Sequence, residues 1–420
     1  QPPDGNHLEE SGGDGGMKWE KVKLGDVCEI TSSKRIFYSE YVDDGVPFYR
    51  SKEIIESDEG KIIENPLYIS VDKYNEIKEK FGVPQTGDML LTSVGTIGIP
   101  YIIKKKDCFY FKDGNLTWFR DFREGLNSKY LYYWIKSSEG TGTLYNTTIG
   151  SSQKALTISA LKNIKVSLPP RSVQDKIVEV VSVYDDLIEN NQKQIKLLEE
   201  AAQRLYKEWF VDLNFPGHEN TKIVDGVPEG WNICPFSSKV DIMSGGTPKT
   251  SIPDYYNGRI PFYTPKDSDG AFFAYKTQMN ITEGGLKNCN SRLYPPKTVI
   301  ITARGTVGKT TILAVPMAMN QSCYALKMKE NDAPYYLFFA LNNEIKALQT
   351  MANGGVFNTI IGKTFDSINI QIPKDPLIYG FEETVRPFME QIKNKLQANS
   401  KLVEARNRLL LKMMNGEVEV

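Results

Sequence analysis

The sequence predicts an α+β protein with an internal tandem repeat, in which two similar mixed α/β heads are joined by two long helices that form an antiparallel coiled coil. Segments of the first half recur in the second half, namely Trp19 as Trp231, residues 47–49 (PFY) as 261–263, and residues 90–98 (LLTSVGTIG) as 300–308 (IITARGTVG). Each half also ends in a stretch with apolar residues three and four positions apart, as in a coiled coil. A repeated head and rod place two similar sites at a fixed separation on one molecule.

The length and composition are those of an ordinary globular protein. The chain has 420 residues, of which 40% are apolar and 11% aromatic, which suits two or three domains with proper cores. It contains neither a run of 18 apolar residues nor a basic leader before an apolar stretch, so we expect a cytoplasmic protein with no membrane partner. Residues 1–16 are polar and Gly-rich and precede Met17, so we interpret them as a disordered leader or tag remnant.

The strand and helix signals follow the repeat. The first head contains the β-rich runs GVPFYRS, DMLLTSVG, IPYIIKK and CFYFKDGNLTWF and one helical stretch near YLYYWIKSS. The predicted organisation is a leader at 1–16, a first head at 17–168, a first spacer helix at 169–212, a second head at 213–372 and a second spacer helix at 373–416.

The first spacer helix begins after the proline pair at 169–170, with Ser172 as its predicted N-cap and Asp175 three residues further on. Five heptads give roughly 50 Å of helix at about 1.5 Å per residue. One seam position of the first helix comprises Val181, Ile188, Ile195, Ala202 and Trp209, and the other comprises Ile177, Tyr184, Asn191, Leu198 and Leu205.

The same spacing of apolar residues recurs in the second helix, 204 positions later in the sequence. Its apolar seam comprises Phe381, Val385, Phe388, Ile392, Leu402 and Leu409, and its polar seam residues are Lys395, Asn399 and Arg406. Polar seam residues reduce stability and help to fix register. Each helix could instead pack on its own head, but two matching helices in a duplicated chain favour mutual packing, with the heads at opposite ends of an antiparallel pair.

The inventory of reactive side chains argues against several kinds of chemistry. Five cysteines without a CxxC pair fit a reducing compartment, where we interpret them as small buried side chains. The only histidines, His7 and His218, cannot form a cluster, so we predict no metal site. No strand–GxGxxG–helix unit and no Asn/Asp-Pro-Pro-aromatic motif of an amino-methyltransferase occurs. We therefore expect no catalytic residue and no cofactor in this chain.

One segment imitates a phosphate-binding loop. Residues 303–310 read ARGTVGKT, with alanine where the first glycine should stand, and the first half has Ile99 in place of Lys309. The shared element is therefore Gly-Thr-aliphatic-Gly, which predicts a tight strand-to-strand turn. The residues that supply backbone angles unfavourable to other side chains are Gly95, Gly98, Gly305 and Gly308. A nucleotide hydrolase would rest on Lys309 alone.

The net charge of −1 at first disfavours a nucleic-acid binder, because phosphate contacts need Lys and Arg. However, the leader contributes −4, the helix at 171–209 contributes −2, and residues 374–420 contribute +1, which leaves +4 for the heads. Arg and Lys suit guanine, Asn and Gln suit adenine, and Lys, Ser and Thr suit phosphates. The candidate DNA-binding residues are Lys34, Arg35, Arg50, Lys52, Ser152, Gln153, Lys154, Lys249, Lys266, Arg304, Lys309 and Asn358.

Three segments resemble the specificity subunit of Type I restriction–modification systems. They are LPPRSVQDKIVEVVSVYDDLIENNQKQIKLLEEAAQRLYKEWF at 168–210, DGVPEGW…SGGTPKTSIPDYYNGRIPFYTPKD at 225–267, and GSSQKALTISALKNIKVSLPP at 150–170, and the match extends over 17–416. The resemblance implies that each head is a target recognition domain and that the helices are a spacer between two half-sites. It implies double-stranded DNA, two methylation subunits and restriction subunits as partners, and it assigns S-adenosylmethionine, ATP and Mg to those subunits.

We therefore interpret the chain as a non-catalytic, sequence-specific DNA-binding subunit that reads a bipartite, asymmetric target and directs separate methylation and restriction subunits to it. The alternative is a protein-interaction scaffold with two heads on a helical rod, which the near-neutral charge favours. DNA binding that weakens as salt rises would separate the two hypotheses.

Overall fold

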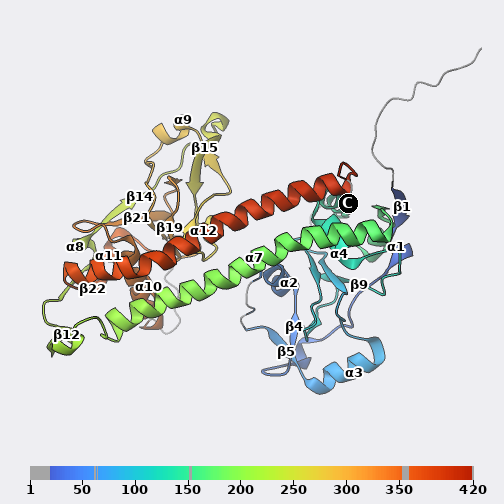
Figure 1. Ribbon diagram of the computed structural model, residues 1–420, viewed down its shortest axis with the longest axis horizontal. Helices are drawn as coiled ribbons and strands as arrows, with labels where there is room; N and C mark the ends of the chain where they lie inside the picture. The colour runs from blue at the N-terminus through green and yellow to red at the C-terminus, as the bar shows by residue number, and fades with distance from the viewer. Residues whose placement is uncertain (1–18, 61–62, 64, 151–153, 352–358, 419–420) are drawn as a thin grey trace, which may run out of the picture. The chain divides into compact units, whose positions relative to one another are not determined.

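The computed structural model describes residues 19–60, 63, 65–150, 154–351 and 359–418. The predicted leader at 1–16 lies outside the described residues. The chain divides into two compact units, 1–189 with 401–420 and 190–400, so each unit holds one head and a part of both long helices (Figure 1). No described helix combines the length and the apolar character that a membrane span requires.

The first head is built on two four-stranded sheets. The first sheet is antiparallel, in the order β2 (Glu29–Thr31), β9 (Leu116–Arg120), β6 (Met89–Thr92) and β7 (Pro100–Ile102). The second has the order β3 (Tyr41–Val42), β5 (Leu67–Ile69), β4 (Val46–Tyr49) and β8 (Tyr110–Phe111), with β4 and β8 parallel. Strands β1 (Glu20–Lys23) and β10 (Lys165–Leu168) form a separate pair. The helices are α1 (Leu24–Val27), α2 (Ser51–Asp58), α3 (Val71–Phe81), α4 (Ser128–Lys136), α5 (Ser138–Thr147) and α6 (Ile158–Asn163).

The second head repeats this topology. Its larger sheet has the order β14 (Val240–Ser244), β21 (Cys323–Met328), β18 (Val299–Thr302), β19 (Thr310–Leu313) and β16 (Phe273–Ala274), and its smaller sheet has the order β17 (Asn280–Ile281), β15 (Tyr256–Tyr263) and β20 (Ala318–Met319). The remaining strands pair as β13 (Asn232–Pro235) with β22 (Asn369–Ile372) and β11 (Ile223–Val224) with β12 (Val227–Pro228). The helices are α8 (Phe236–Lys239), α9 (Glu283–Lys287), α10 (Pro334–Met351) and α11 (Gly362–Ser367).

The predicted tandem repeat is confirmed at the level of strand pairing. The order β2-β9-β6-β7 corresponds to β14-β21-β18-β19, and the parallel pair of β4 with β8 corresponds to the parallel pair of β15 with β20. A close approach is also repeated, because a Cβ at Gly45 would lie 2.3 Å from the Ile69 carbonyl oxygen and a Cβ at Gly258 would lie 2.3 Å from that of Ile281. Both positions therefore require glycine.

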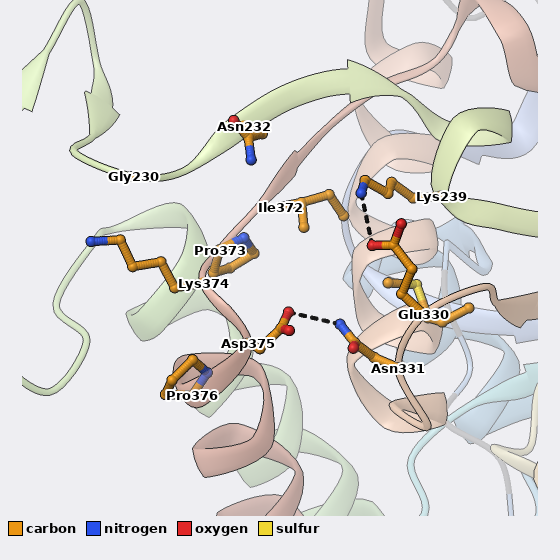
Figure 2. Close-up of a pocket in the computed structure, with 11 residues that line it drawn as sticks. Gly230, Asn232, Lys239, Glu330, Asn331, Ile372, Pro373, Lys374, Asp375 and Pro376 are labelled. Atoms are coloured by element: carbon orange, nitrogen blue, oxygen red, sulfur yellow. Dashed lines mark hydrogen bonds and ion pairs between the residues drawn. The ribbon is translucent and has the colours of Figure 1, made fainter.

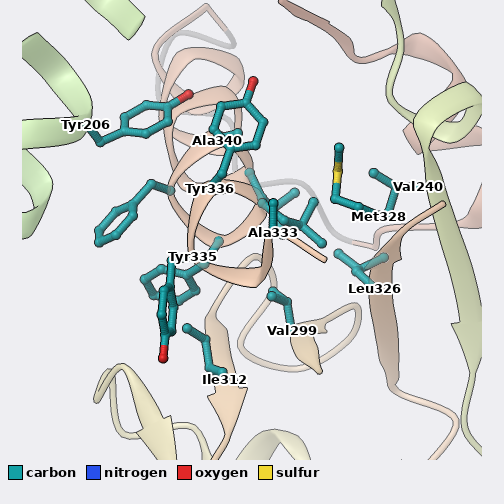
Figure 3. Packing of buried hydrophobic residues seen from close by; sticks show 14 of the residues in the cluster. Tyr206, Val240, Val299, Ile312, Leu326, Met328, Ala333, Tyr335, Tyr336 and Ala340 are labelled. Atoms are coloured by element: carbon teal, nitrogen blue, oxygen red, sulfur yellow. The ribbon is translucent and has the colours of Figure 1, made fainter. Parts of the chain in front are cut away.

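Each head buries one of its sheets, the β14 sheet in the second head and the β2 sheet in the first, beneath a helix. In the second unit, Tyr335, Tyr336 and Ala340 of α10 pack with apolar side chains of β14, β18, β19 and β21, and Tyr206 of the long helix α7 joins them (Figure 3). In the first unit, α4 takes this place, and Leu131 and Trp134 are almost fully buried. A helix was predicted for this segment, YLYYWIKSS, and that prediction is confirmed.

The two long helices are α7 (Arg171–Tyr206), with 36 residues, and α12 (Asp375–Met414), with 40 residues. A short π-helical segment, Lys207–Val211, continues α7. The predicted N-cap at Ser172 is wrong, because the helix begins at Arg171, two residues earlier than that cap would imply. The carbonyl of Pro170 accepts the first bonds from the N–H groups of Val173 and Gln174, so Pro170 occupies the capping position and Ser172 lies inside the first turn.

The long helices pair antiparallel within each unit, as predicted. In the first unit, Ile177 and Val181 of α7 share a core with Leu410 and Met413 of α12. In the second unit, Ile195, Ala202 and Tyr206 share a core with Phe381, Val385 and Ile392. Residue numbers therefore fall along α12 as they rise along α7. These cores also contain head residues, so packing between the helices and packing on the heads occur together.

The predicted seam residues lie at positions that are buried or half-buried. The buried apolar ones are Ile177, Val181, Ile195, Ala202, Phe381, Val385 and Ile392, and the half-buried ones include Tyr184, Ile188, Asn191, Leu198, Leu205, Trp209, Phe388, Leu402 and Leu409. Polar seam residues pair within their unit: Asn191 donates to Asn399 at 2.8 Å, and Arg406 forms an ion pair with Asp185. Such pairs favour one register over its neighbours.

Candidate nucleic-acid interface

In each head, the Gly-Thr-aliphatic-Gly segment turns the chain between two adjacent antiparallel strands, β6 and β7 in one and β18 and β19 in the other. The four glycines predicted for these turns have φ angles of 79°, 88°, 82° and 81°, in the region that favours glycine. The predicted turns are confirmed. Because strand β19 follows Lys309, the segment lacks the strand–loop–helix arrangement of a phosphate-binding loop.

A buried threonine braces each turn from inside. Thr92 and Thr302 are fully buried, and their hydroxyls accept hydrogen bonds from the N–H groups of Ile99 (2.9 Å) and Lys309 (3.0 Å). The backbone bonds are duplicated as well, since Gly98 donates to the Thr92 carbonyl at 2.8 Å and Gly308 to the Thr302 carbonyl at 2.9 Å. Each head therefore presents its turn on a fixed frame, as precise recognition requires.

The segment after each threonine is held from both sides. Ser93 donates to the Asn115 carbonyl and its own carbonyl accepts from Leu156, at 2.8 and 2.9 Å. In the second head, Ala303 donates to Ser322 and accepts from Ile360, at 2.7 and 2.9 Å. These bonds gather a loop after β8 or β20 and a later loop around each turn, so each turn is the centre of a surface built from segments distant in sequence.

In the second head, three candidate cations lie around the turn. Arg304 and Lys309 flank the Gly305 tip and are exposed, and neither forms an ion pair with any residue that the structure describes. The hydroxyl of Thr306 donates to the Pro265 carbonyl at 3.3 Å, which brings the turn beside the 3-10 segment that carries exposed Lys266. The structure therefore places Lys266, Arg304 and Lys309 on adjoining segments at the turn, and we name these three exposed residues the turn cluster.

Lys249 belongs to a loop next to this region. Thr247, two residues before it, is hydrogen-bonded to Gln321, and Gly246 donates to the Met319 carbonyl at 3.1 Å. The segment 320–322 in turn holds the glycine turn through Ser322. The loop of Lys249 thus borders the same surface, although its side chain makes no described contact with the turn cluster.

The turn of the first head carries no cation, because Val94 and Ile99 stand where the second head has Arg304 and Lys309. Positive charge comes from neighbouring loops instead. Arg35 is 2.8 Å from Asp113, in the loop that also holds Ser93. Lys154 precedes Ala155, which bridges to Val94, and its ammonium lies 3.7 Å from the ring centre of exposed Tyr145.

The other candidates of the first head differ in their accessibility. Lys34 is exposed, and its ammonium lies 5.0 Å from the ring centre of Phe81. Arg50 binds Glu53 through two side-chain hydrogen bonds, of 2.6 and 3.2 Å, and its backbone N–H binds the same carboxylate. Burial raises the pKa of Glu53, but the bonds from Arg50 outweigh this effect and lower the pKa. Arg50 therefore holds the start of α2, and the spacing of Arg50 and Glu53 was the signal that sequence reasoning overlooked.

The remaining candidate DNA-binding residues are Lys52, Ser152, Gln153 and Asn358. Lys52 is exposed and lies 3.6 Å from Glu56. Ser152, Gln153 and Asn358 lie outside the described residues. Within the described part of the chain, no group of His, Cys, Asp and Glu side chains is arranged to hold a metal ion.

A pocket lies at the start of α12. It is lined in part by Lys239, Glu330, Asn331 and Asp375. Lys239 pairs with Glu330 at 2.8 Å, and Asn331 donates to Asp375 at 3.1 Å, so these polar groups satisfy one another (Figure 2). We therefore place the candidate interface on the glycine turns.

The fold and the candidate interface define a class of protein: a duplicated binding protein whose two heads present similar turn frames with different side chains. The family model described as "Type I restriction modification DNA specificity domain" matches residues 17–200 and 228–397. The chain belongs to this family, as its sequence resemblance predicted. The family is that of the specificity subunit, the non-catalytic DNA-recognition subunit of Type I restriction–modification enzymes, so the chain is one component of a larger assembly.

Individual relatives agree with the family match. The chain is 27% identical over 421 residues to the Type I restriction enzyme MjaIX specificity subunit of Methanocaldococcus jannaschii, covering 96% of this chain and 94% of that protein. It is 23% identical over 325 residues to the HindI specificity subunit of Haemophilus influenzae, covering 63% and 71%. The crystal structure of an S subunit from M. genitalium has the same fold, with a TM-score of 0.54, 16% identity, and coverage of 97% and 98%.

Proposed function

We propose that this chain reads a bipartite, asymmetric DNA target, with each head contacting one half-site around its glycine turn. The observation that supports this most directly is that one braced turn frame occurs twice with different side chains, Val94 and Ile99 in the first head and Arg304 and Lys309 in the second. Identical heads would read two identical half-sites. Heads that share a frame but differ at the tip suit an asymmetric target.

The partners complete the proposal. We propose that two methylation subunits, which bind S-adenosylmethionine, and restriction subunits, which use ATP and Mg, act on the DNA that this chain selects. Because the heads carry only a small positive excess, the methylation subunits would supply much of the attraction to phosphates. Double-stranded DNA should therefore bind the assembly more tightly than it binds this chain alone.

The proposal can be tested by co-expression. The chain and a candidate Type I methylation subunit are produced in a host without DNA methylation, and modified adenines are mapped across the genome by single-molecule sequencing. A split motif with a constant gap is the expected result. A stable complex that leaves no site-specific methylation would contradict the proposal and favour a protein-interaction scaffold.

Changing Arg304 to alanine should relax the target at one position of one half-site. An arginine that binds a guanine edge contributes about 1–3 kcal/mol of discrimination, which is roughly 5- to 150-fold in binding. Changing Lys309 to alanine should instead weaken binding to all sequences and lower the salt dependence by about one ion. Binding of the assembled complex to target variants, measured at several salt concentrations, distinguishes the two effects.

Lys287, an exposed cation on α9, provides the matched control. A Lys287→Ala variant should keep wild-type affinity and specificity. If Arg304→Ala shows the same target preference as Lys287→Ala at every position, the turn cluster does not read bases through Arg304.

A further inference from the structure

In the second unit, the helix α10 has no N-terminal cap from its own chain segment. Ala333 precedes the helix and its methyl group cannot accept a hydrogen bond, and Pro334 has no N–H. Glu382 of the long helix α12 fills this role. Its side chain is almost fully buried, and its carboxylate accepts a hydrogen bond from the N–H of Tyr336 at 2.7 Å. A residue of the spacer therefore caps the main helix of the head.

The first unit also has a buried polar side chain of a long helix that binds the start of a head helix, and we call each such contact a polar tie. Gln174 of α7 is fully buried, and two of the hydrogen bonds of its side chain are made with the segment that leads into α4. Its carbonyl accepts from the N–H of Asn127, the N-cap of α4, at 2.9 Å. Its amide donates to the carbonyls of Gly125 and Pro169, both at 2.8 Å. Both long helices thus reach the N-terminal end of the corresponding head helix through one buried polar side chain.

A second contact accompanies each tie at matching positions. Asn127 donates to Asp175 of α7 at 2.6 Å, and Tyr379 of α12 donates to Asn331 at 3.3 Å. The two asparagines and the two helix residues are related by the same offset, 204, that relates the seams of the long helices. The contact between the head asparagine and its long helix is therefore duplicated, whereas Gln174 and Glu382 lie at positions that this offset does not relate.

Polar ties constrain this junction in a way that apolar packing does not. Hydrogen bonds depend on direction and weaken steeply when the donor and acceptor tilt, whereas apolar surfaces tolerate repacking of similar volume. A buried donor left without its partner costs about 1–3 kcal/mol. A head that rotated on its helix would separate Gln174 from Asn127 and Gly125 in the first unit, and Glu382 from the N–H of Tyr336 in the second.

We infer that Gln174 and Glu382 are positioning residues that fix the angle of each head on its own long helix and thereby restrict the protein to one gap length between half-sites. This inference rests on the proposed reading of a split target. A gap changed by one base pair displaces a half-site by about 3.4 Å and rotates it by roughly 35°. A firmly held head cannot follow such a displacement, whereas a head that is free to tilt can.

The acid–base state of Glu382 shows which substitution preserves the tie. Burial raises the pKa of this carboxyl to about 7, against the lowering effects of the Tyr336 and Tyr335 amides and of Arg386 and Lys297. Near neutral pH, the group therefore exists in charged and uncharged forms, and both keep an acceptor oxygen. Glutamine is uncharged and supplies the same acceptor, so Glu382→Gln should retain the function, whereas Glu382→Leu removes it.

The test uses complexes of the full chain with its methylation subunit and a DNA library in which the wild-type half-sites are separated by gaps of different lengths. Wild-type complexes should prefer one gap over its neighbours by on the order of 100-fold. Glu382→Leu and Gln174→Leu should each reduce this preference to about tenfold while keeping the same half-site bases. Glu382→Gln should restore the wild-type preference, and Glu383→Leu, at an exposed neighbouring position, should not change it.

The gap preference measured for the variants decides whether Gln174 and Glu382 are positioning residues. An undiminished gap preference in either leucine variant that still assembles would overturn the inference. If Glu382→Leu fails to assemble, Glu382→Asp, whose shorter side chain withdraws the carboxylate from the Tyr336 amide, is measured on the same library with the same criterion. A wild-type complex that methylates no split target would refute the proposed function itself, which is a different outcome from a wild-type complex with one gap and variants that keep it.

Discussion

Replacement of Leu410 by alanine should destabilise the first head by about 2–5 kcal/mol, although residue 410 lies in the last helix of the chain. Leu410 is 3% exposed and belongs to the same core as Ile177 of α7 and Leu131 of α4. Removing most of its side chain leaves a cavity among residues that are themselves almost completely buried. Hydrogen exchange should therefore become faster in β6 and β9, while β18 and β21 of the second head remain protected.

The neighbouring residue supplies the control. Leu411 has 43% of its surface exposed, so Leu411→Ala should change the unfolding free energy by less than about 0.5 kcal/mol. Equal protection of the first head in the two variants would show that α12 does not complete that head. Loss of protection in both heads of Leu410→Ala would show that the two units unfold together.

Insertion of seven residues into both long helices should lengthen the gap between half-sites by about three base pairs. Seven helical residues add about 10.5 Å, and each base pair spans about 3.4 Å. The insertions belong after Gln192 in α7 and after Gln397 in α12, because Asn191 and Asn399 bind each other at this level. A whole heptad keeps the seam in phase, so the helices can still pair.

Mapping methylated adenines gives the new gap directly, and the half-site sequences should stay the same. Insertion into α7 alone is the control, because it shifts the seam of one helix against the other and separates Asn191 from Asn399. That variant should lose methylation or stability. If the doubly extended protein methylates sites with the original gap, the long helices do not set the distance between half-sites.

The features that could be predicted from the sequence are those with a local cause. Glycine turns need positive φ wherever they occur, and the seams of α7 and α12 follow from apolar spacing along one helix. Comparison of the two halves also excluded a false motif: the first half has Ile99 at the position of Lys309, which argued against a phosphate-binding role for that lysine. The antiparallel pairing followed from the order of the segments along the chain.

The features that the sequence did not reveal depend on contacts between distant segments or on short polar helices. Helix α3 has a polar sequence and is capped by Ser70, whose hydroxyl accepts from Lys73. Gln174 and Glu382 look like ordinary polar helix residues until α4 and α10 are placed against them. The bond between the Arg50 guanidinium and Glu53 was not predicted, although the two residues are three positions apart at the start of α2. Ser172 matched a capping pattern, but the proline pair ahead of it starts the helix earlier.

Because α12 runs antiparallel to α7, the core of the first head contains residues that are synthesised near the end of translation. The ribosome makes the first head early, but Leu410 and Met413, which belong to its core, emerge about 230 positions after Val181. At roughly 5–20 residues per second, that head waits on the order of ten to fifty seconds for its last packing partners. During this interval, the apolar side chains that α12 will cover remain open to solvent, to chaperones and to proteases. A chain released before residue 401 would keep that surface uncovered for its whole lifetime.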